Sequence, residues 1–183
     1  MVLLESVQIE LGTKMPEFQL NDSNSTPHST QSEIGKKGLL IVFTCNHCPY
    51  AQAVWERVIK IAAQAKKLGI NTVAINPNIN PDYPEDSPER MKKLIKTLDI
   101  KFPYLVDEVQ QTARDFKAQC TPDIYLVNAK NELAYHGRID DNWQDEHTVK
   151  NHELLAAINA LANGLPQAEK QYPSTGCSIK WVD

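Results

Sequence analysis

The sequence lacks the features that mark nucleic-acid-binding, membrane-spanning and disulfide-stabilised secreted proteins. No block of lysine and arginine stands out, and the net charge is −4, so the basic footprint of a nucleic-acid binder is missing. The longest apolar run, residues 39–43, is far too short to cross a membrane. Residues 1–5 have no basic segment and meet an acid at once, unlike a signal peptide. Four cysteines are too few for a secreted disulfide scaffold. We therefore expect a cytoplasmic protein that binds neither nucleic acid nor membrane.

The length and composition are those of one globular domain. The chain has 183 residues, of which 42% are hydrophobic and 23% are charged. A chain of this length buries roughly 70% of its extended surface, so it folds without a disulfide or metal. We expect a single domain over residues 1–183, with residues 167–183 as a C-terminal tail of unassigned structure.

The hydrophobic pattern predicts a strand, a helix and a second strand in the first half of the chain. The apolar run 39–43 suits a strand buried on both faces. Apolar residues then recur every three or four positions up to Leu68, which is typical of a helix that ends at Gly69. Residues 70–75 form the second expected strand. This order indicates a βαβ unit with parallel strands.

Helices and strands alternate in the second half as well. Ser87 followed by Pro88 is a favoured helix start. The other expected elements are strands at 102–106, 124–127 and 132–136, and helices at 109–116 and 154–161. The chain is therefore expected to form one α/β domain.

Cys45 and Cys48 form a CxxC motif where the first buried strand gives way to the helix. The N–H groups of a helix N-terminus favour an anion, which lowers the pKa of a cysteine there and produces the reactive thiolate. We expect Cys45 to be the exposed nucleophile. Cys48, one helical turn later, would resolve the mixed disulfide. His47 would add a positive charge beside the thiolate.

Other readings of the cysteines and histidines remain open. The CxxC pair can also be structural, or half of a zinc site. Cys120 is a candidate third redox thiol, a metal ligand with Cys45 and Cys48, or a small buried packing residue. Cys177 is either a distant resolving thiol or a packing residue. His136 lacks metal-ligand spacing and is expected to face solvent.

Four segments resemble the alkyl hydroperoxide reductase/thiol-specific antioxidant (peroxiredoxin-like) group of the thioredoxin-fold superfamily. Residues 11–22 are similar to the opening of that group. Residues 43–50 (FTCNHCPY), 120–123 (CTPD) and 176–181 (GCSIKW) are similar to a peroxiredoxin-like subfamily often labelled thiol-disulfide isomerase or redoxin. The resemblance implies a thioredoxin-like fold, in which helices flank a central mixed β-sheet with an N-terminal β extension.

The same resemblance implies which residues form the site. Cys45 and Cys48 would be catalytic, with support from Thr44, Asn46, His47, Pro49, Thr121 and Pro122. Pro122 would be a cis-proline, which turns the Thr121 backbone toward an extended substrate for strand-like pairing. No organic cofactor or metal is implied, because the Cys45–Cys48 disulfide is itself the redox centre.

Two departures from related patterns affect the expected activity. Thioredoxins carry a tryptophan where this chain has Thr44, and a buried acid where it has Leu39, so no proton acceptor for Cys48 is identified. On the peroxiredoxin pattern, the pair Cys48-Pro49 matches the peroxidatic cysteine and its proline, whereas Cys45 replaces the threonine that orients the peroxide. The required arginine has three candidates: Arg57, Arg114 and Arg138.

The leading hypothesis is a thiol-disulfide oxidoreductase with an antioxidant role. Its partners would be protein or small-molecule disulfides, and a thiol such as thioredoxin or glutathione would reduce it again. The first alternative is a thiol peroxidase that uses Cys48 or Cys45. The second is a redox-inert or metal-binding module with the same fold.

Overall fold

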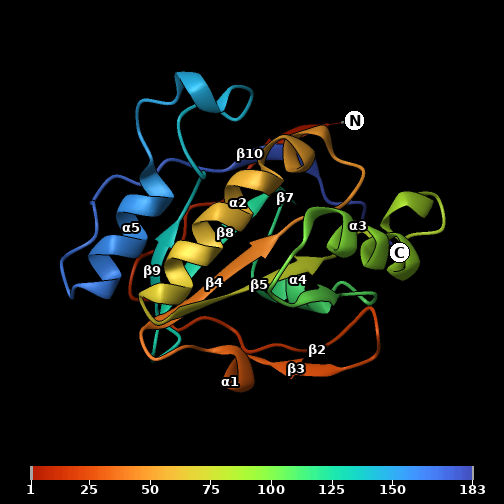
Figure 1. Cartoon of the computed structure of the whole chain (residues 1–183), viewed down its shortest axis with the longest axis horizontal. Helices are drawn as coiled ribbons and strands as arrows, with labels where there is room; N and C mark the ends of the chain where they lie inside the picture. Colours follow the sequence, from red (N-terminus) through yellow and green to blue (C-terminus); the bar gives the residue numbers. More distant parts are fainter. Residues whose placement is uncertain (1, 183) are drawn as a thin grey trace.

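The computed structural model describes residues 2–182 as an α/β fold around a central mixed sheet (Figure 1). The strand order in this sheet is β3-β2-β6-β5-β4-β8-β9. Neighbours β4, β5 and β6 are parallel, and the remaining pairs are antiparallel. The strands are β2 (Gln19–Asp22), β3 (Pro27–Ser29), β4 (Gly38–Phe43), β5 (Ile70–Asn76), β6 (Tyr104–Val106), β8 (Asp123–Asn128) and β9 (Leu133–His136).

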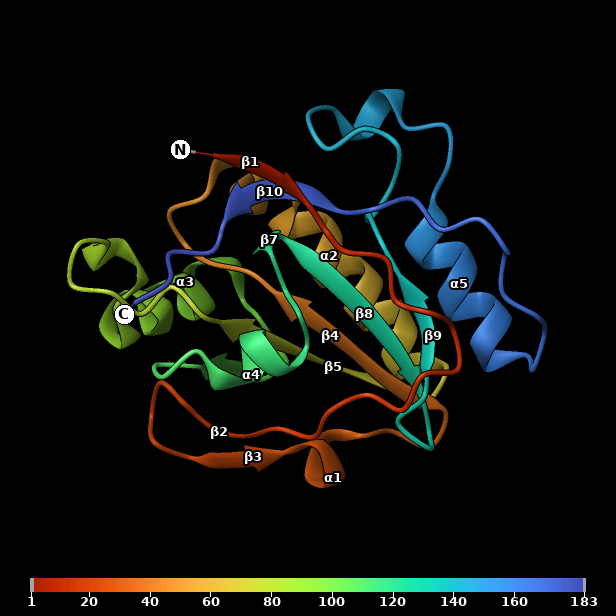
Figure 2. The ribbon, with the colours of Figure 1, turned by 180° about the vertical axis from the view of Figure 1, so that it is seen from behind.

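A second, three-stranded sheet joins the two ends of the chain. Its order is β1 (Leu3–Glu5), β10 (Thr175–Ser178) and β7 (Cys120–Thr121), and both pairs are antiparallel. Figure 2 shows β1 and β10 side by side, with β7 below them. The C-terminal segment, unassigned from its sequence, therefore contains a strand. The expected N-terminal β extension consists of β1, β2 and β3.

Helices cover both faces of the central sheet. In Figure 1, α2 (Pro49–Lys67) lies across the sheet, with α5 (Glu153–Ala162) on one side and α3 (Pro88–Leu98) on the other. The opposite face is covered by α4 (Gln111–Asp115) and the N-terminal segment. The short α1 (Thr30–Glu33) and the 3₁₀ turns η1 (Pro84–Asp86) and η2 (Glu146–Thr148) lie in connections. Among the helices within residues 2–182, none is both long enough and apolar enough for a membrane crossing.

The central strand β4 explains how the core is divided. All six of its residues are buried. Side chains alternate between the two faces of a strand; Ile41 and Phe43 pack toward Phe116 after α4, whereas Val42 packs toward Val58 on α2. A strand buried on both faces needs the continuous apolar run that the sequence has.

The βαβ unit is confirmed: β4 and β5 are parallel, and α2 connects them. The expected helix at residue 88 is confirmed as α3, and each of the other expected elements appears within a few residues of its predicted bounds. One local prediction is wrong. The helix after the CxxC begins at Pro49, so Cys48 is its N-cap residue and Cys45 lies before it. Proline at the first helical position explains this start, because proline has no N–H to lose there.

Candidate redox site

The four cysteines are all buried thiols in the structure. Cys45 and Cys48 are both 0% exposed, and they pack with Ala51 of α2 and Cys177 of β10. The expectation that Cys45 is an exposed nucleophile is therefore wrong for this conformation. Tyr50 packs against the same cluster from outside, and its ring lies 3.9 Å from that of Trp143, measured between centroids. The Tyr50 ring thus packs on the thiol cluster, and the Trp143 ring contacts the Tyr50 ring at a tilt of 31°.

Thr121 contacts both thiols of the motif. Its hydroxyl oxygen lies 3.3 Å from Cys45 Sγ, and its carbonyl oxygen lies 3.1 Å from Cys48 Sγ, which donates a hydrogen bond to it only when protonated. The following peptide bond, Thr121–Pro122, is cis, which confirms the geometry that the resemblance implied. The Thr121 backbone therefore lies at the motif, but it is buried and paired with Cys177 of β10, so in this structure it does not face an incoming substrate as expected.

Cys48 is the more acidic thiol of the pair. Its pKa is lowered to about 5, first by a hydrogen bond from Cys45 and further by hydrogen bonds from Cys177 and from the backbone N–H of Ala51, although burial opposes them. Ala51 lies in the first turn of α2, where backbone N–H groups have no partner within the helix. The position at the helix N-terminus thus acts on Cys48, not on Cys45 as the sequence analysis expected.

Cys45 is the less acidic thiol of the pair. Burial raises the pKa of its thiol well above the usual value of 9.0, and a hydrogen bond to Cys48 and the negative charge of Asp86 raise it further. Of the two thiols, Cys48 is therefore the one that loses its proton first. The expected order of acidity is reversed.

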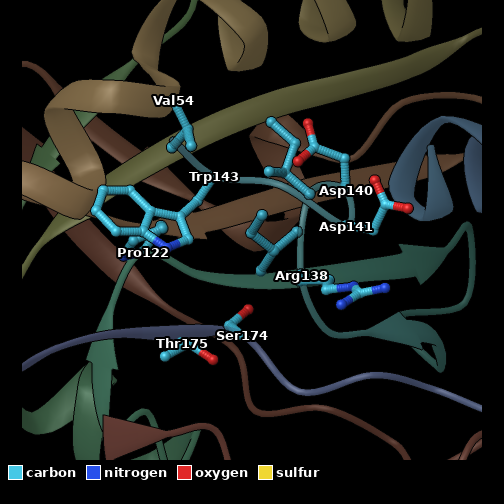
Figure 3. A pocket seen from close by; sticks show the side chains of 10 residues that line it. Val54, Pro122, Arg138, Asp140, Asp141, Trp143, Ser174 and Thr175 are labelled. Atoms are coloured by element: carbon cyan, nitrogen blue, oxygen red, sulfur yellow. The ribbon is translucent and has the colours of Figure 1, made fainter. Parts of the chain in front are cut away.

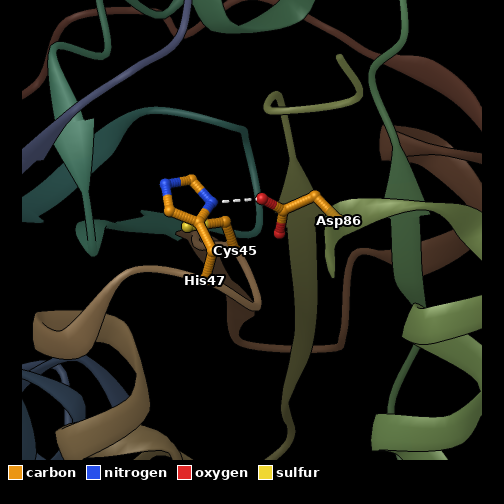
Figure 4. Close-up of side chains that lie close together, drawn as sticks. All are labelled: Cys45, His47 and Asp86. Carbon is orange, nitrogen blue, oxygen red and sulfur yellow. Dashed lines mark hydrogen bonds and ion pairs between the residues drawn. The ribbon is translucent and has the colours of Figure 1, made fainter. Parts of the chain in front are cut away.

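Asp86 is a site residue that the sequence analysis missed. It belongs to η1, in the connection between β5 and α3, and it is 0% exposed. Its carboxylate accepts hydrogen bonds from the backbone N–H of Asn46 (2.5 Å) and from the ring Nδ1 of His47. Figure 4 shows this ring directed at Asp86, with Cys45 beside it. His47 does lie beside Cys45, but its hydrogen bond goes to the carboxylate.

The remaining support residues hold the motif in place. The Asn46 side chain donates to the carbonyl of Glu85 (2.8 Å) and accepts from the Tyr104 hydroxyl (3.1 Å). The N–H of Thr44 donates to the carbonyl of Ile75 (2.9 Å), which continues the pairing of β4 with β5 beyond its last residue. Pro49 starts α2. The segment between the two cysteines is therefore tied to η1 and to β6.

The structure does not bring together Cys45, Cys48 and Cys120, which the sequence suggested as metal ligands. Within residues 2–182, the group whose ligand atoms lie within 4.8 Å of one another is Cys45, His47 and Asp86, and Cys120 is not in it. A thiolate, an imidazole and a carboxylate are donors that zinc accepts. In this group, however, the imidazole and the carboxylate are hydrogen-bonded to each other.

Cys120 and Cys177 differ in their contacts. The Cys120 thiol faces backbone carbonyls, at 3.6 Å from Pro122 and 3.9 Å from Ser174, and burial raises its pKa strongly. Cys177 Sγ lies only 2.6 Å from Cys48 Sγ. The structure therefore places Cys177, and not Cys120, against the CxxC motif.

A small pocket adjoins the cis-proline. Its volume is about 100 Å³, and its wall includes Pro122, Trp143 and Thr175. Figure 3 shows the indole of Trp143 near Pro122 at one end and the charged groups of Asp141 and Arg138 at the other. Its apolar end lies beside the Thr121–Pro122 backbone.

A buried ion pair and a buried histidine–carboxylate hydrogen bond lie around the site. The guanidinium of Arg57 on α2 is 2.6 Å from Asp140 and also donates to the carbonyl of Trp143, which ties the Trp143 loop to α2. His136 is 2% exposed and pairs with the fully buried Asp123 at 2.9 Å, so the expectation that it faces solvent is wrong. The arginines proposed from the peroxiredoxin pattern have other partners: Arg57 binds Asp140, Arg138 binds Glu153, and Arg114 lies over the Trp181 ring.

A mixed sheet of this topology, with two cysteines at the start of a helix and a cis-proline beside them, is the thioredoxin-like fold. The chain belongs to the AhpC/TSA family, whose family model matches residues 11–136. A search of curated proteins found no match.

Solved structures support the same assignment. An uncharacterized conserved protein from Geobacillus kaustophilus is 38% identical, with a TM-score of 0.94 over 100% of this chain and 97% of that one. A hypothetical protein from Sinorhizobium meliloti is 34% identical, with a TM-score of 0.92 over 97% and 98% of the two chains. The peroxidoxin BcpB from Mycobacterium tuberculosis shares the fold at 13% identity, with a TM-score of 0.65 over 84% of this chain and 98% of that one.

Proposed function

We propose that the protein is a thiol-disulfide oxidoreductase whose redox centre is the pair Cys45 and Cys48. The observation that carries the proposal is the position of Cys48: a buried thiol packed against Cys45, at a helix N-terminus beside the cis Thr121–Pro122 bond, where the hydrogen bond from Cys45 lowers its pKa to about 5. A thiolate is the reactive form of cysteine, and a neighbouring thiol allows a mixed disulfide to be resolved within the protein.

The reaction consists of two exchanges. The Cys48 thiolate attacks one sulfur of a substrate disulfide, forms a mixed disulfide and releases the first substrate thiol, which takes up a proton. The Cys45 thiol then loses its proton and attacks Cys48 Sγ. This forms the Cys45–Cys48 disulfide and releases the second substrate thiol. No bound cofactor takes part.

Substrates and reductant follow from this chemistry. The substrate is a small or protein disulfide. Strand-like pairing of a substrate with Thr121 would require β10 to move away, because Cys177 already pairs with Thr121. A thiol such as thioredoxin or glutathione returns the cysteine pair to the reduced state. Such recycling needs a reducing compartment, which agrees with a cytoplasmic location. An antioxidant role would follow from the repair of oxidised thiols.

A thiol peroxidase is the second candidate function. Cys48 is fully buried, and a small peroxide reaches a buried thiol more easily than a protein disulfide does. The low pKa of Cys48 and the proline that follows it, Pro49, also favour a peroxidase. Against it, Cys45 replaces the peroxide-orienting threonine, and Arg57, Arg114 and Arg138 have other partners. We therefore expect disulfides to react faster than peroxides.

The two functions are separated by stopped-flow fluorescence of the reduced protein. Oxidised glutathione and hydrogen peroxide are compared at equal concentrations. We expect the disulfide to react faster, Cys48→Ser to abolish the reaction, and Cys120→Ser, which removes a buried thiol outside the motif, to leave it unchanged. Faster oxidation by peroxide would favour the peroxidase, and full reactivity of Cys48→Ser would overturn both.

A further inference from the structure

Cys48 has a thiol neighbour on each side. Besides Cys45, Cys177 on β10 places its Sγ 2.6 Å from Cys48 Sγ, and both side chains are almost fully buried. A disulfide has an S–S length of about 2.05 Å, so the two sulfurs need to move by only about half an ångström to bond. Cys120, in contrast, has only carbonyl oxygens near its sulfur among its hydrogen-bond partners.

The backbone holds Cys177 in this position. In the pairing of β10 with β7, Cys177 is opposite Thr121, whose carbonyl also contacts the Cys48 thiol. The two strands approach so closely at Gly176 that an added Cβ would lie 2.1 Å from the Thr121 carbonyl oxygen. Pairing with β1, where Leu3 is opposite Cys177, fixes the other edge of β10. The approach of Cys177 to Cys48 is therefore set by two strand pairings.

We propose that Cys177 is a third redox thiol, which exchanges with the Cys45–Cys48 disulfide to form a Cys48–Cys177 disulfide. The inference rests on the proposed function, because the substrate disulfide supplies the oxidising equivalent. In the exchange, Cys177 loses its proton and attacks Cys48 Sγ, the Cys45–Cys48 bond breaks, and Cys45 leaves as a thiolate that takes up a proton. One disulfide and one thiol are present before and after, so no further oxidant is needed.

The pKa of Cys177 explains why its exchange follows the formation of the Cys45–Cys48 disulfide. In the reduced protein the pKa of Cys177 is raised to about 12, first by burial and then by its hydrogen bond to Cys48 and the negative charge of that thiolate, while Lys180 opposes the rise. Both effects of Cys48 disappear once its sulfur is in a disulfide. Cys177 therefore becomes a better nucleophile after the first disulfide has formed.

Disulfide mapping tests this proposal on the unmodified chain. The reduced protein is oxidised with one equivalent of oxidised glutathione, quenched with acid, alkylated with N-ethylmaleimide and digested with trypsin. Cys45 and Cys48 share the tryptic peptide 38–57, whereas Cys177 lies in peptide 171–180. A Cys45–Cys48 bond therefore leaves one peptide lighter by two hydrogens, and a Cys48–Cys177 bond joins two peptides.

We expect both products from the wild type, with the joined peptides increasing as the single-peptide disulfide declines. In Cys45→Ser we expect the joined peptides alone, whereas Cys120→Ser should match the wild type. A wild type that holds only the Cys45–Cys48 bond, together with a folded Cys45→Ser that keeps glutathione on Cys48, would overturn the inference and leave the proposed function intact. Failure of glutathione to react with Cys48 would instead overturn both.

Discussion

The carboxylate of Asp86 is hydrogen-bonded to the ring of His47, although 39 positions separate the two residues. This contact joins η1 to the segment between the two active-site cysteines, and it places a buried negative charge beside Cys45. In the thioredoxin pattern a buried acid belongs to the strand before the motif, where this chain has Leu39. Here the acid near the thiols comes from a different connection.

The charge of Asp86 adds to the effects of burial and of the Cys48 hydrogen bond in raising the pKa of Cys45. Because its carboxylate raises the pKa of Cys45, Asp86→Asn is expected to lower that pKa. The check is alkylation of Cys45 between pH 7 and 10, followed by mass spectrometry, in a Cys48→Ser background. Glu85→Gln, at the neighbouring exposed acid, is the control and should change little. An unchanged Cys45 profile in Asp86→Asn would contradict this role.

Cys48 is expected to titrate near pH 5. The thiolate absorbance at 240 nm should therefore fall with a midpoint near this value as the pH is lowered, and Cys48→Ser should remove the step. Cys45→Ala should move the midpoint to higher pH, because it removes the hydrogen bond that lowers the pKa most. A single step near the ordinary thiol range of about 8.5 would refute the assignment of the thiolate to Cys48.

Tyr50 should limit access to the thiols, since it packs against their cluster and its ring contacts that of Trp143. We expect Tyr50→Ala to increase the rate of alkylation of Cys48 by a bulky maleimide more than by iodoacetamide. Tyr172→Ala, at a tyrosine outside this cluster, serves as the control. Equal acceleration of both reagents would argue against a steric cover and for general loosening of the fold.

The Arg57–Asp140 pair should stabilise the fold. Its side chains are 6% and 3% exposed, and breaking a buried pair leaves an uncompensated charge at a cost of about 3–5 kcal/mol. Asp140→Ala should therefore lower the free energy of unfolding by about 3 kcal/mol in urea titration. Glu146→Ala breaks the exposed pair with Lys60 (57% and 44% exposed) and should cost less than about 1 kcal/mol. Similar losses in both variants would contradict the role of burial.

The fold could largely be predicted from local patterns. Strand β4 is a continuous apolar run, and α2 has apolar residues at helical spacing, so both were visible in the sequence. The start of α2 was predicted too early, at Cys45, although Pro49 suits the first helical position. The acidity of Cys48 follows only once that start is placed correctly.

Two parts of the site could not be predicted because they depend on distant contacts. Cys177 is 129 positions from Cys48, and their approach depends on β10 pairing with β7 and β1. No apolar alternation marks residues 175–178 (TGCS), since strand pairing there depends on small residues that allow close backbones. Asp86 lay in a proline-rich loop with no motif around it. The hydrogen bonds from Asn46 and His47 to the Asp86 carboxylate form only once the chain has folded and brought η1 against the CxxC segment.

The most direct test of the account is to trap the first mixed disulfide. The double variant Cys45→Ser, Cys177→Ser removes both thiols that contact Cys48, so an adduct formed there cannot be resolved within the cluster. After reaction with oxidised glutathione, peptide mapping should find glutathione on Cys48. The rate should fall as the pH is lowered, with a midpoint above the value of about 5 in the unmodified chain, because the hydrogen bonds from Cys45 and Cys177 that lower the pKa are missing. In the single variant Cys48→Ser, no adduct should form at neutral pH. Glutathione on Cys45 in that variant, or an unmodified Cys48 in the double variant, would contradict the proposal that Cys48 is the attacking thiol.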